Sequence, residues 1–465
     1  MSHSAHCSSS VWSRRSVLRI GALWPLGLTT ADLLRAESSA GVRNSRKAVV
    51  NIHLDGGPPH QDMIDLKPRA PVEIRGPVRA IDTTLPGLQI SEQLPLTASV
   101  ADRFTFIRSL VGSAGAHDAF QCQSGFAASD LQPLGGRPAL GCAAAKLLGK
   151  QTDVAPPFVD LMQGRALVRN SARPGFLGPT YQAFRPDISR MFARKLEKGM
   201  EGELARRGEN HTVSYALNSS LTVRRLDDRL RLLRDVDRFR ADWDRAGMME
   251  ALDGFNAQAL GILTSGSFAR AMDLAQEDER TNRLYSLETS GPADVGTSDG
   301  PGAVRKLQLA RRLIEAGVRC VSLTLSDYDT HRDNFGRLHL LMPVLDRALY
   351  AFTTDLAERG MLDDVTIVVW GEFGRTPKIN SNGGRDHWPG AGMCLLAGGG
   401  LRHGQVVGAT DRYGAVVTSR PVRYLDVMAT LYRGLGIDPM HATLVDPTGR
   451  PQHVAGDGRV LEELT

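Results

Sequence analysis

Cysteine, aromatic residues and net charge are all scarce in this chain of 465 residues. It has five cysteines and no C-x-x-C pair, which excludes a disulfide framework and a cysteine-rich zinc site. Buried thiols are expected, although a bridge between Cys122 and Cys142 stays open. Aromatic residues make up 6% of the chain and the net charge is only +5, with no basic stripe interleaved with aromatics. These features exclude a typical nucleic-acid-binding protein.

Long apolar runs are also missing. No stretch reaches about 18 consecutive apolar residues, so we expect no transmembrane helix in the mature chain. The N-terminus instead carries the string SRRSVLR at 13–19 and a shorter apolar run at 20–34, followed by small residues. This pattern is typical of a twin-arginine export signal, and we assign it to residues 1–36. The protein is therefore expected to be exported, for example to a periplasm, with an amphipathic first helix as the alternative.

The remaining residues, 37–465, read as one α/β domain. Four short apolar runs have the composition of buried strands, and each ends in a loop with glycine or polar residues. Helical patterns at 304–316 and 338–359 alternate with these runs. This alternation predicts a three-layer sandwich with a mostly parallel central sheet. A charge-dense helical insertion is expected at about 186–290. The four runs lie at 47–54, 104–110, 320–325 and 365–370.

Carboxylates and imidazoles gather at the ends of these predicted strands. Ligands bind at the carboxyl ends of parallel strands, where the outgoing loops form a crevice. Asp, Glu and His together, without Cys, suit a hydrolytic site for Zn²⁺ or Mn²⁺. Each residue alone is equally compatible with a helix cap, a turn or a structural histidine. The candidate metal ligands are Asp55, Asp329, His331, Glu372, Asp386 and His387.

Five strings in the sequence, together with the leader, resemble the DUF1501 family of exported bacterial proteins. They are HLDGGPPHQDMIDLKPRAP, EIRGP, DYDTH, VVWGEFGRTPKIN and GRDHWP, and the resemblance spans about 49–461. That family belongs to the alkaline phosphatase and sulfatase-like superfamily. The resemblance implies a two-metal core in which Asp55 is the first ligand and Asp329 with His331 the second pair, with Asp327 as a rival to Asp329.

Later positions of the implied core are less regular. His387, with Asp386, would supply the last ligand. Glu372 stands where an Asp-His pair is usual, and Phe373 replaces the imidazole, so either one or two ions remain compatible with the sequence. No cysteine begins the C-x-P-x-R string of a formylglycine sulfatase, which disfavours standard sulfatase chemistry.

Three further residues are candidates for the reaction itself. Ser113 is the candidate nucleophile, with a purely flexible loop as the alternative. His117 is expected to bind an ester oxygen or to act as general acid. Arg375 is expected either to bind an anionic oxygen or to form an ion pair with a nearby acid. His60 would line the pocket or orient Asp55.

The resulting hypothesis is an exported, metal-dependent hydrolase of phosphate or sulfate esters, using one or two Zn²⁺ or Mn²⁺ ions. Its substrate would be an anionic small molecule or a glycan ester. The alternative is a non-catalytic protein on the same scaffold that binds anionic glycans or a partner protein. A structural component of the cell surface is a third reading.

Overall fold

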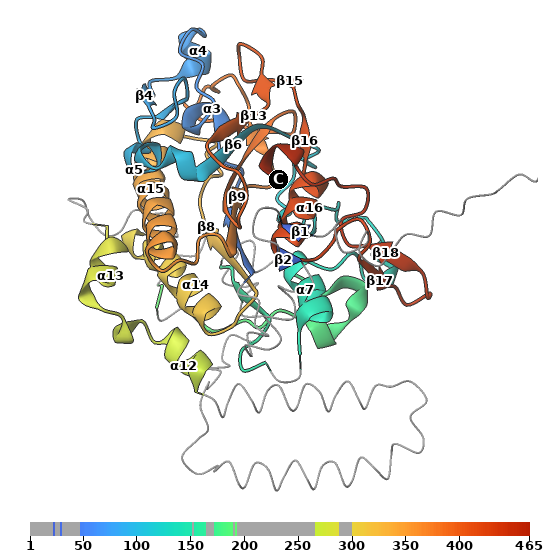
Figure 1. Ribbon diagram of the computed structural model, residues 1–465. Coiled ribbons are helices and arrows are strands. Elements are labelled where there is room, and N and C mark those ends of the chain that lie inside the picture. Colours follow the sequence, from blue (N-terminus) through green and yellow to red (C-terminus); the bar gives the residue numbers. More distant parts are fainter. Residues whose placement is uncertain are drawn as a thin grey trace, which may run out of the picture. The chain divides into compact units, whose positions relative to one another are not determined.

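The computed structural model describes residues 47–150, 153–163, 172–188, 191–192, 266–287 and 300–465 and two short strands before them (Figure 1). The chain divides into two compact units, Met1–Ser45 and Arg46–Thr465. In the first unit β1 (Ala22–Leu23) pairs antiparallel with β2 (Leu28–Thr29). The rest of the predicted signal, 1–36, lies outside the described residues.

A sheet of eight strands forms the centre of the second unit. Its order is β13-β6-β12-β9-β3-β8-β7, with β16 also paired to β6. Only β12 is antiparallel to its neighbours among these described strands, so the carboxyl ends of β3, β6, β8 and β9 lie at one edge. The strands are β3 (Ala48–Leu54), β6 (Phe104–Val111), β7 (Phe158–Leu161), β8 (Cys320–Leu325), β9 (Val365–Trp370), β12 (Gly392–Gly398), β13 (Gln405–Val407) and β16 (Val422–Arg423).

All four predicted strands are confirmed as β3, β6, β8 and β9. They form where they do because their β-branched and aromatic residues pack on both faces of a covered sheet. Every residue of β3, β8 and β9 is buried. Alternate residues of β3 enter different cores: Val50 and Ile52 join one apolar cluster, whereas Val49 joins the other.

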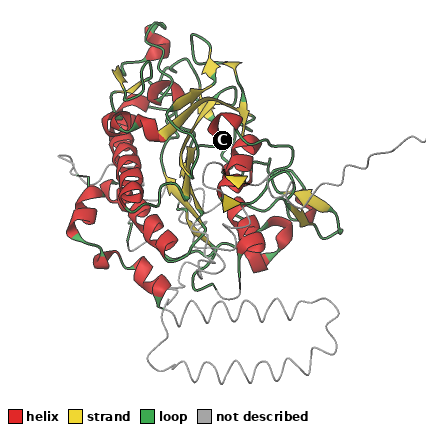
Figure 2. Ribbon diagram, in the orientation of Figure 1, coloured by secondary structure: helices red, strands yellow, loops and turns green. Residues whose placement is uncertain are grey.

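Helices cover both faces of this sheet, as Figure 2 shows. The cluster on one face takes in α5 (Pro95–Ser99), α14 (Arg305–Glu315) and α15 (Asn334–Glu358). The cluster on the other face takes in α7 (Leu140–Leu148) and α16 (Tyr424–Gly434). The predicted three-layer α/β sandwich is therefore confirmed, and α14 and α15 match the two predicted helices.

Most of the predicted helical insertion, about 186–290, lies outside the described residues. The longest described part of it, 266–287, contains α12 (Ser267–Met272), the 3-10 turn η5 (Leu274–Gln276) and α13 (Glu279–Leu284). α12 packs against α14, so this end of the segment belongs to the same face of the sheet as α14.

Short elements complete the described chain. The helices are α3 (His60–Met63), α4 (Val72–Arg75), α6 (Gln121–Ser124), η1 (Ala101–Arg103), η2 (Gln132–Leu134), η3 (Gly175–Leu177), η4 (Pro179–Tyr181), η6 (Pro301–Val304) and η7 (Glu462–Leu464). The paired strands are β4 (Ala80–Asp82) with β5 (Gln89–Ser91), β10 (Gly374–Arg375) with β11 (His387–Trp388), β14 (Ala409–Thr410) with β15 (Val417–Ser419), and β17 (Thr443–Val445) with β18 (Pro451–His453).

The four cysteines among the described residues are buried free thiols, as expected from their spacing. Cys122 and Cys142 are both unpaired, so the bridge that the sequence left open does not form. Burial raises the pKa of these thiols, and that of Cys320 reaches about 12, which keeps it protonated. Within the described ranges, none of the helices has the length and apolar character needed to cross a membrane.

Candidate metal centre

The carboxyl edge of the sheet brings two groups of possible metal ligands together. We call His53, Asp55 and Glu372 the inner group, and His117, Asp329 and His387 the outer group. Within each group the ligand atoms all lie within 4.8 Å of one another. Strand exits supply most of them, because β3, β6, β8 and β9 all end at this edge.

The inner group is closed to solvent. His53, Asp55 and Glu372 are 0%, 6% and 2% exposed. The Nε2 atom of His53 lies 3.4 Å from Oε2 of Glu372 and 3.9 Å from Oδ1 of Asp55. Neither ring nitrogen of His53, nor Oε2 of Glu372, has a hydrogen-bond partner among the described residues. Such atoms are costly to bury, so the group has unused bonding capacity.

The backbone at Gly56 holds the other carboxylate oxygen of Glu372, Oε1. The amide of Gly56 donates to its Oε1 atom at 3.0 Å. Gly56 has a φ of +104°, and a Cβ there would lie 2.4 Å from the amide nitrogen of Asp329, so only glycine fits. Burial raises the pKa of Glu372, but the hydrogen bond with His117 and the nearby His53 imidazole outweigh it and lower the pKa overall. Glu372 is therefore a carboxylate.

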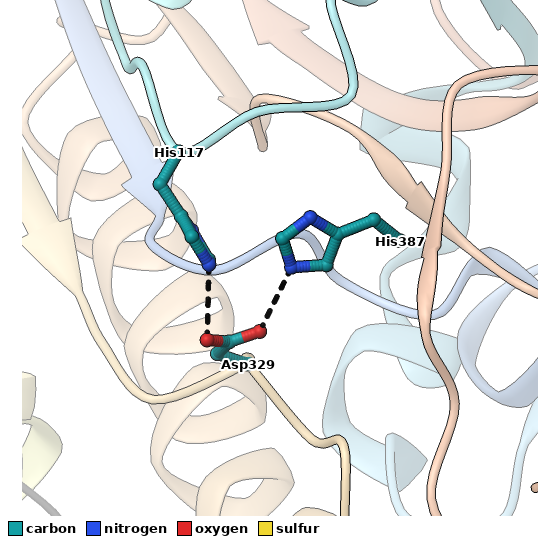
Figure 3. A group of neighbouring side chains, drawn as sticks. All are labelled: His117, Asp329 and His387. Atoms are coloured by element: carbon teal, nitrogen blue, oxygen red, sulfur yellow. Dashed lines mark hydrogen bonds and ion pairs between the residues drawn. The ribbon is translucent and has the colours of Figure 1, made fainter.

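The outer group is more open than the inner one. Figure 3 shows Asp329 in contact with both His117 and His387. The Nε2 atom of His117 lies 3.0 Å from Oδ2 of Asp329, and Nε2 of His387 lies 3.3 Å from its Oδ1. The side chains of His117 and Asp329 are each 17% exposed, and that of His387 is 25% exposed. A molecule in solution can therefore reach this group but not the inner one.

The tautomer of His387 is set by the backbone. Its Nδ1 atom lies 3.1 Å from the carbonyl oxygen of Gly115, which can only accept, so Nδ1 carries the proton. The Nε2 atom that faces Asp329 then bears a lone pair unless the ring is protonated. A lone pair facing a carboxylate requires a proton or a cation between them, and metal-binding histidines are commonly held in this way.

His117 joins the two groups. Its Nδ1 atom lies 3.3 Å from Oε1 of Glu372, while Nε2 contacts Asp329. A neutral imidazole has a single N–H and cannot donate to both carboxylates. The predicted role of His117 toward an ester oxygen stays a prediction, and its position between the groups suits it equally to bind a cation.

Arg375 is buried and forms the ion pair that was one of its two predicted roles. Its Nη2 atom donates to Oδ1 of Asp329 at 2.6 Å and to the carbonyl oxygen of Gly56. Its Nε donates to Gly57 O at 2.9 Å, and Nη1 to Arg385 O at 2.8 Å. Every nitrogen of the guanidinium is thus engaged within the protein.

These contacts determine the charge of Asp329. Burial raises the pKa of its carboxyl, but the contacts with His117, His387 and Arg375 lower it far below the ordinary range. Asp329 is therefore ionised. Its predicted rival, Asp327, points elsewhere and pairs with Arg337 at the start of α15. The structure thus brings Asp329, and not Asp327, to the other candidates.

His331 and Asp386 form a half-exposed pair beside the outer group. The Nδ1 atom of His331 lies 2.6 Å from Oδ1 of Asp386, and its Nε2 lies 3.1 Å from Oδ1 of Asp329. Asn380 donates to both the carbonyl of His331 and the carboxylate of Asp386. Asp386 therefore contacts His331 and belongs to neither group of ligands. His331 contacts Asp329 at the solvent-exposed edge of the outer group.

Ser113 and His60 make contacts that fix loops. The hydroxyl of Ser113 donates to the carbonyl oxygen of Glu372 at 2.6 Å and accepts from the amide of Gly115 at 3.0 Å. His60 is buried, with Nε2 2.9 Å from Gly414 O, and is in neither group. The predicted nucleophilic role of Ser113 remains a prediction.

His53 is the ligand candidate that sequence reasoning missed. It lies inside an apolar run, and a histidine there reads as part of the core. A signal was nevertheless present, because Asn51 and His53 share one face of β3 and Asp55, directly after the strand, continues their alternation. Asn51 uses this face to accept a hydrogen bond from Trp370, and His53 uses it to reach Glu372.

The residues present fit a divalent cation. Both groups combine imidazole nitrogen with carboxylate oxygen and contain no thiolate, which favours Zn²⁺ or Mn²⁺ over Ca²⁺ and Mg²⁺. The orphaned buried atoms of the inner group point to the same conclusion.

The sequence of residues 46–465 matches the DUF1501 family, described as proteins of unknown function. The chain belongs to the DUF1501 family. This confirms the predicted membership over nearly the whole of the second unit. No curated protein matches the sequence.

Solved structures similar to this DUF1501 chain include two enzymes named for ester hydrolysis. The PsFucS1 sulfatase from Pseudoalteromonas sp. has 12% identity and a TM-score of 0.36, covering 87% of this chain and 70% of that one. A phosphonate monoester hydrolase of Agrobacterium radiobacter has 13% identity and a TM-score of 0.34, covering 90% and 77%. Ps i-CgsB has 11% identity and a TM-score of 0.38, covering 89% and 74%. At these scores none of the three carries its activity over to this chain.

Proposed function

We propose that this DUF1501 protein is a divalent-metal-dependent hydrolase of phosphate or sulfate esters. The observation that carries the proposal is the meeting of a closed group and an open group of ligands at one edge of the sheet, joined by His117. Several buried carboxylates in one place are costly without a cation to neutralise them. The open group gives an anionic substrate access to that place.

A divalent ion at this site would act as a Lewis acid toward an ester oxygen. The chain's own residues would prepare the reaction. Arg375 holds the Asp329 carboxylate in one orientation through a buried ion pair. His331, whose side chain is 43% exposed and held by Asp386, presents an imidazole at the rim, where it can hold or give a proton to a leaving oxygen.

The proposal is tested by turnover before and after metal removal. The mature protein is assayed with p-nitrophenyl phosphate and p-nitrophenyl sulfate, dialysed against a chelator, and assayed again after Zn²⁺ or Mn²⁺ is returned. We expect at least one ester to be hydrolysed, with activity lost on chelation and restored by the metal. Turnover that survives complete metal removal, or no turnover of either ester by the metal-loaded protein, would contradict the proposal.

A matched variant controls for loss of an imidazole. His441 forms an exposed pair with Asp438, 2.7 Å long, that resembles the His331–Asp386 pair but lies on another loop. His331→Ala should lower turnover, whereas His441→Ala should leave it unchanged. Equal effects of the two substitutions on turnover would show that His331 has no specific role in the reaction.

One observation favours the alternative of a non-catalytic binding protein. The Ser113 hydroxyl donates its hydrogen bond to the carbonyl oxygen of Glu372, so this side chain helps to hold a loop. On this alternative the metal-loaded protein binds sulfated or phosphorylated oligosaccharides and does not cleave them. Calorimetric titration with such oligosaccharides, followed by product analysis, separates binding from hydrolysis.

We also propose that the protein is exported, on the strength of the SRRSVLR string at 13–19. Replacing Arg14 and Arg15 together by lysine should retain a reporter fusion inside the cell, whereas the native leader should export it. Equal export of the two fusions would contradict a twin-arginine signal.

A further inference from the structure

The two groups of ligands differ in how much of their bonding capacity the protein itself uses. In the inner group, three buried atoms have no hydrogen-bond partner among the described residues: Nδ1 and Nε2 of His53, and Oε2 of Glu372. His53 is fully buried, and its Nε2 atom is directed at both carboxylates of the group. Two carboxylates and one imidazole leave this group strongly negative when the ring is neutral.

In the outer group the protein supplies its own cation. Oδ1 of Asp329 receives Arg375 at 2.6 Å, His331 at 3.1 Å and His387 at 3.3 Å, while Oδ2 receives His117 at 3.0 Å. The guanidinium cannot leave easily, because Gly56 O, Gly57 O and Arg385 O also hold it. A metal ion at Asp329 would have to displace a buried, fully bonded arginine.

We propose that the chain binds a single divalent ion, between His53, Asp55 and Glu372, and that Arg375 takes the place of a second ion beside Asp329. This inference deepens the proposed function and rests on it for the use of a metal. It assigns a ligand, His53, that lies on a strand and not in any of the loops that follow the strands.

His53 also resolves the irregularity at Phe373. The sequence places Phe373 after Glu372, where an imidazole is usual in the superfamily that the chain resembles. In the structure Phe373 stacks on His387 with 4.1 Å between ring centroids, so it belongs to the outer group's wall. The imidazole for the inner group comes instead from His53, on the neighbouring strand β3, which pairs with β9.

The orientation of Glu372 suits one ion on one oxygen. Its Oε1 atom is occupied by the Gly56 amide and by His117, which leaves Oε2 facing His53. A nitrogen and two carboxylate oxygens form a ligand set suited to Zn²⁺ or Mn²⁺. The ion would be held at the buried inner group, directly beside the outer group that a substrate reaches from solvent.

The experiment measures metal stoichiometry, not activity. The full mature chain is stripped with a chelator, reloaded with Zn²⁺ or Mn²⁺, and analysed by plasma mass spectrometry. We expect about one ion per chain for the native protein and for His387→Ala, and at least a tenfold loss of affinity for His53→Ala. His403→Ala removes a partly buried histidine elsewhere, which is hydrogen-bonded to Thr105 and Gly398, and should retain one ion.

Glu372→Gln is the second variant, in case His53→Ala fails to fold. Glutamine keeps the size of the side chain and can still accept from the Gly56 amide, but it loses the charge, so we expect the ion to be lost. Loading with Co²⁺ gives a spectroscopic readout, because its visible absorption depends on the ligands. The spectrum should be the same in the native protein and in His387→Ala.

Two results would overturn the inference. One is two ions per chain in the native protein, with one lost in His387→Ala. The other is one ion that His387→Ala removes and Glu372→Gln retains. A positive test comes from Arg375→Met, in which a folded protein should bind a second ion at the freed Asp329. Metal-dependent turnover is measured separately, so a single ion without hydrolysis would refute the proposed function and leave this inference standing.

Discussion

The inner and outer groups use the same residue types but are held by different parts of the chain. His53 lies on β3, and Asp55 and Glu372 follow β3 and β9 almost directly, so the sheet itself places the inner group. The outer group comes from the loops after β6 and β8 and from the short strand β11. Its geometry therefore depends on buried side chains that tie those loops together, and this dependence makes it the more vulnerable of the two.

The most important of these ties is the pair of Arg385 and Asp62. Both side chains are 0% exposed, and Arg385 donates from Nε and Nη2 to the two carboxylate oxygens, each at 2.7 Å. Asn334 donates to the same carboxylate and accepts from Thr330, which connects the loop after β8 to the loop that carries His387. In the inner group, the pairing of β3 with β9 holds the ligands in place instead.

The largest effect is expected from breaking that tie. Arg385→Ala leaves Asp62 as a buried, unpaired charge and should lower the free energy of unfolding by about 3–5 kcal/mol in urea titration. As a control, Arg79→Ala removes an arginine whose side chain is 83% exposed and paired with Glu92, and should cost at most about 1 kcal/mol. Similar losses for the two variants would show that Arg385 does not hold the outer loops.

The next effect concerns the charge at the centre of the outer group. Asp329→Asn keeps the shape of the side chain but leaves Arg375 without its anionic partner. We expect kcat/KM for the ester that is turned over to fall by about 10²–10³, a typical cost of losing one electrostatic contact in an active site. The metal content should stay at the native value, because the inner group is untouched. Loss of the ion in this variant would show that the inner and outer groups bind metal as one site.

Gly56 lies where the two groups touch and gives the third prediction. Its amide binds Glu372 and its carbonyl binds Arg375, and any Cβ would press on the backbone of Asp329. Gly56→Ala should lower the free energy of unfolding by about 2–3 kcal/mol, from left-handed strain plus this clash. Gly87→Ala is the matched control, since Gly87 has a φ of +80° and open space around it. Gly87→Ala should lower the free energy of unfolding by about 1–2 kcal/mol. Equal losses in the two variants would contradict the close approach at Gly56.

The contrast between the groups also explains what the sequence could predict. The strands were predictable because continuous β-branched runs have few alternatives to a covered sheet. Asp55, Asp329 and Glu372 were predictable because the carboxyl ends of parallel strands share an edge. His387 was a candidate because the Asp-His pair at 386–387 brings two ligand types into one loop, and the family resemblance supported it, although spacing alone did not place it beside Asp329.

Other features depend on contacts between distant parts of the chain. His53 sits among apolar residues, and only its facing Glu372, 319 positions away, distinguishes it from a core histidine. Arg375 had two predicted roles, and the choice between them required the position of Asp329. The loop contacts of Ser113 are with the backbone of Glu372, which no pattern of side chains encodes.

The smallest effect is expected at the rim of the outer group, at Asp386. Its hydrogen bond with His331 lowers the pKa of the Asp386 carboxyl, so the carboxylate stays ionised at ordinary pH. Asp386→Asn removes that charge and loosens the orientation of His331. We expect kcat to fall about tenfold. This is the lower end of the range for residues that orient a histidine in a site, because the pair is half exposed. Asp438→Asn breaks the similar exposed pair with His441 and should not change kcat.

The pH dependence of this last difference separates a charge effect from a loss of shape. A depressed pKa means that the contribution of the Asp386 charge is present above the ordinary carboxyl pKa and is lost only as the pH falls through the lower, folded value. The gap in kcat between the native protein and Asp386→Asn should therefore persist down to about pH 4 and close below it. A gap of constant size at every pH would mean that Asp386 acts on the outer group through packing, as Arg385 does, and not through its charge.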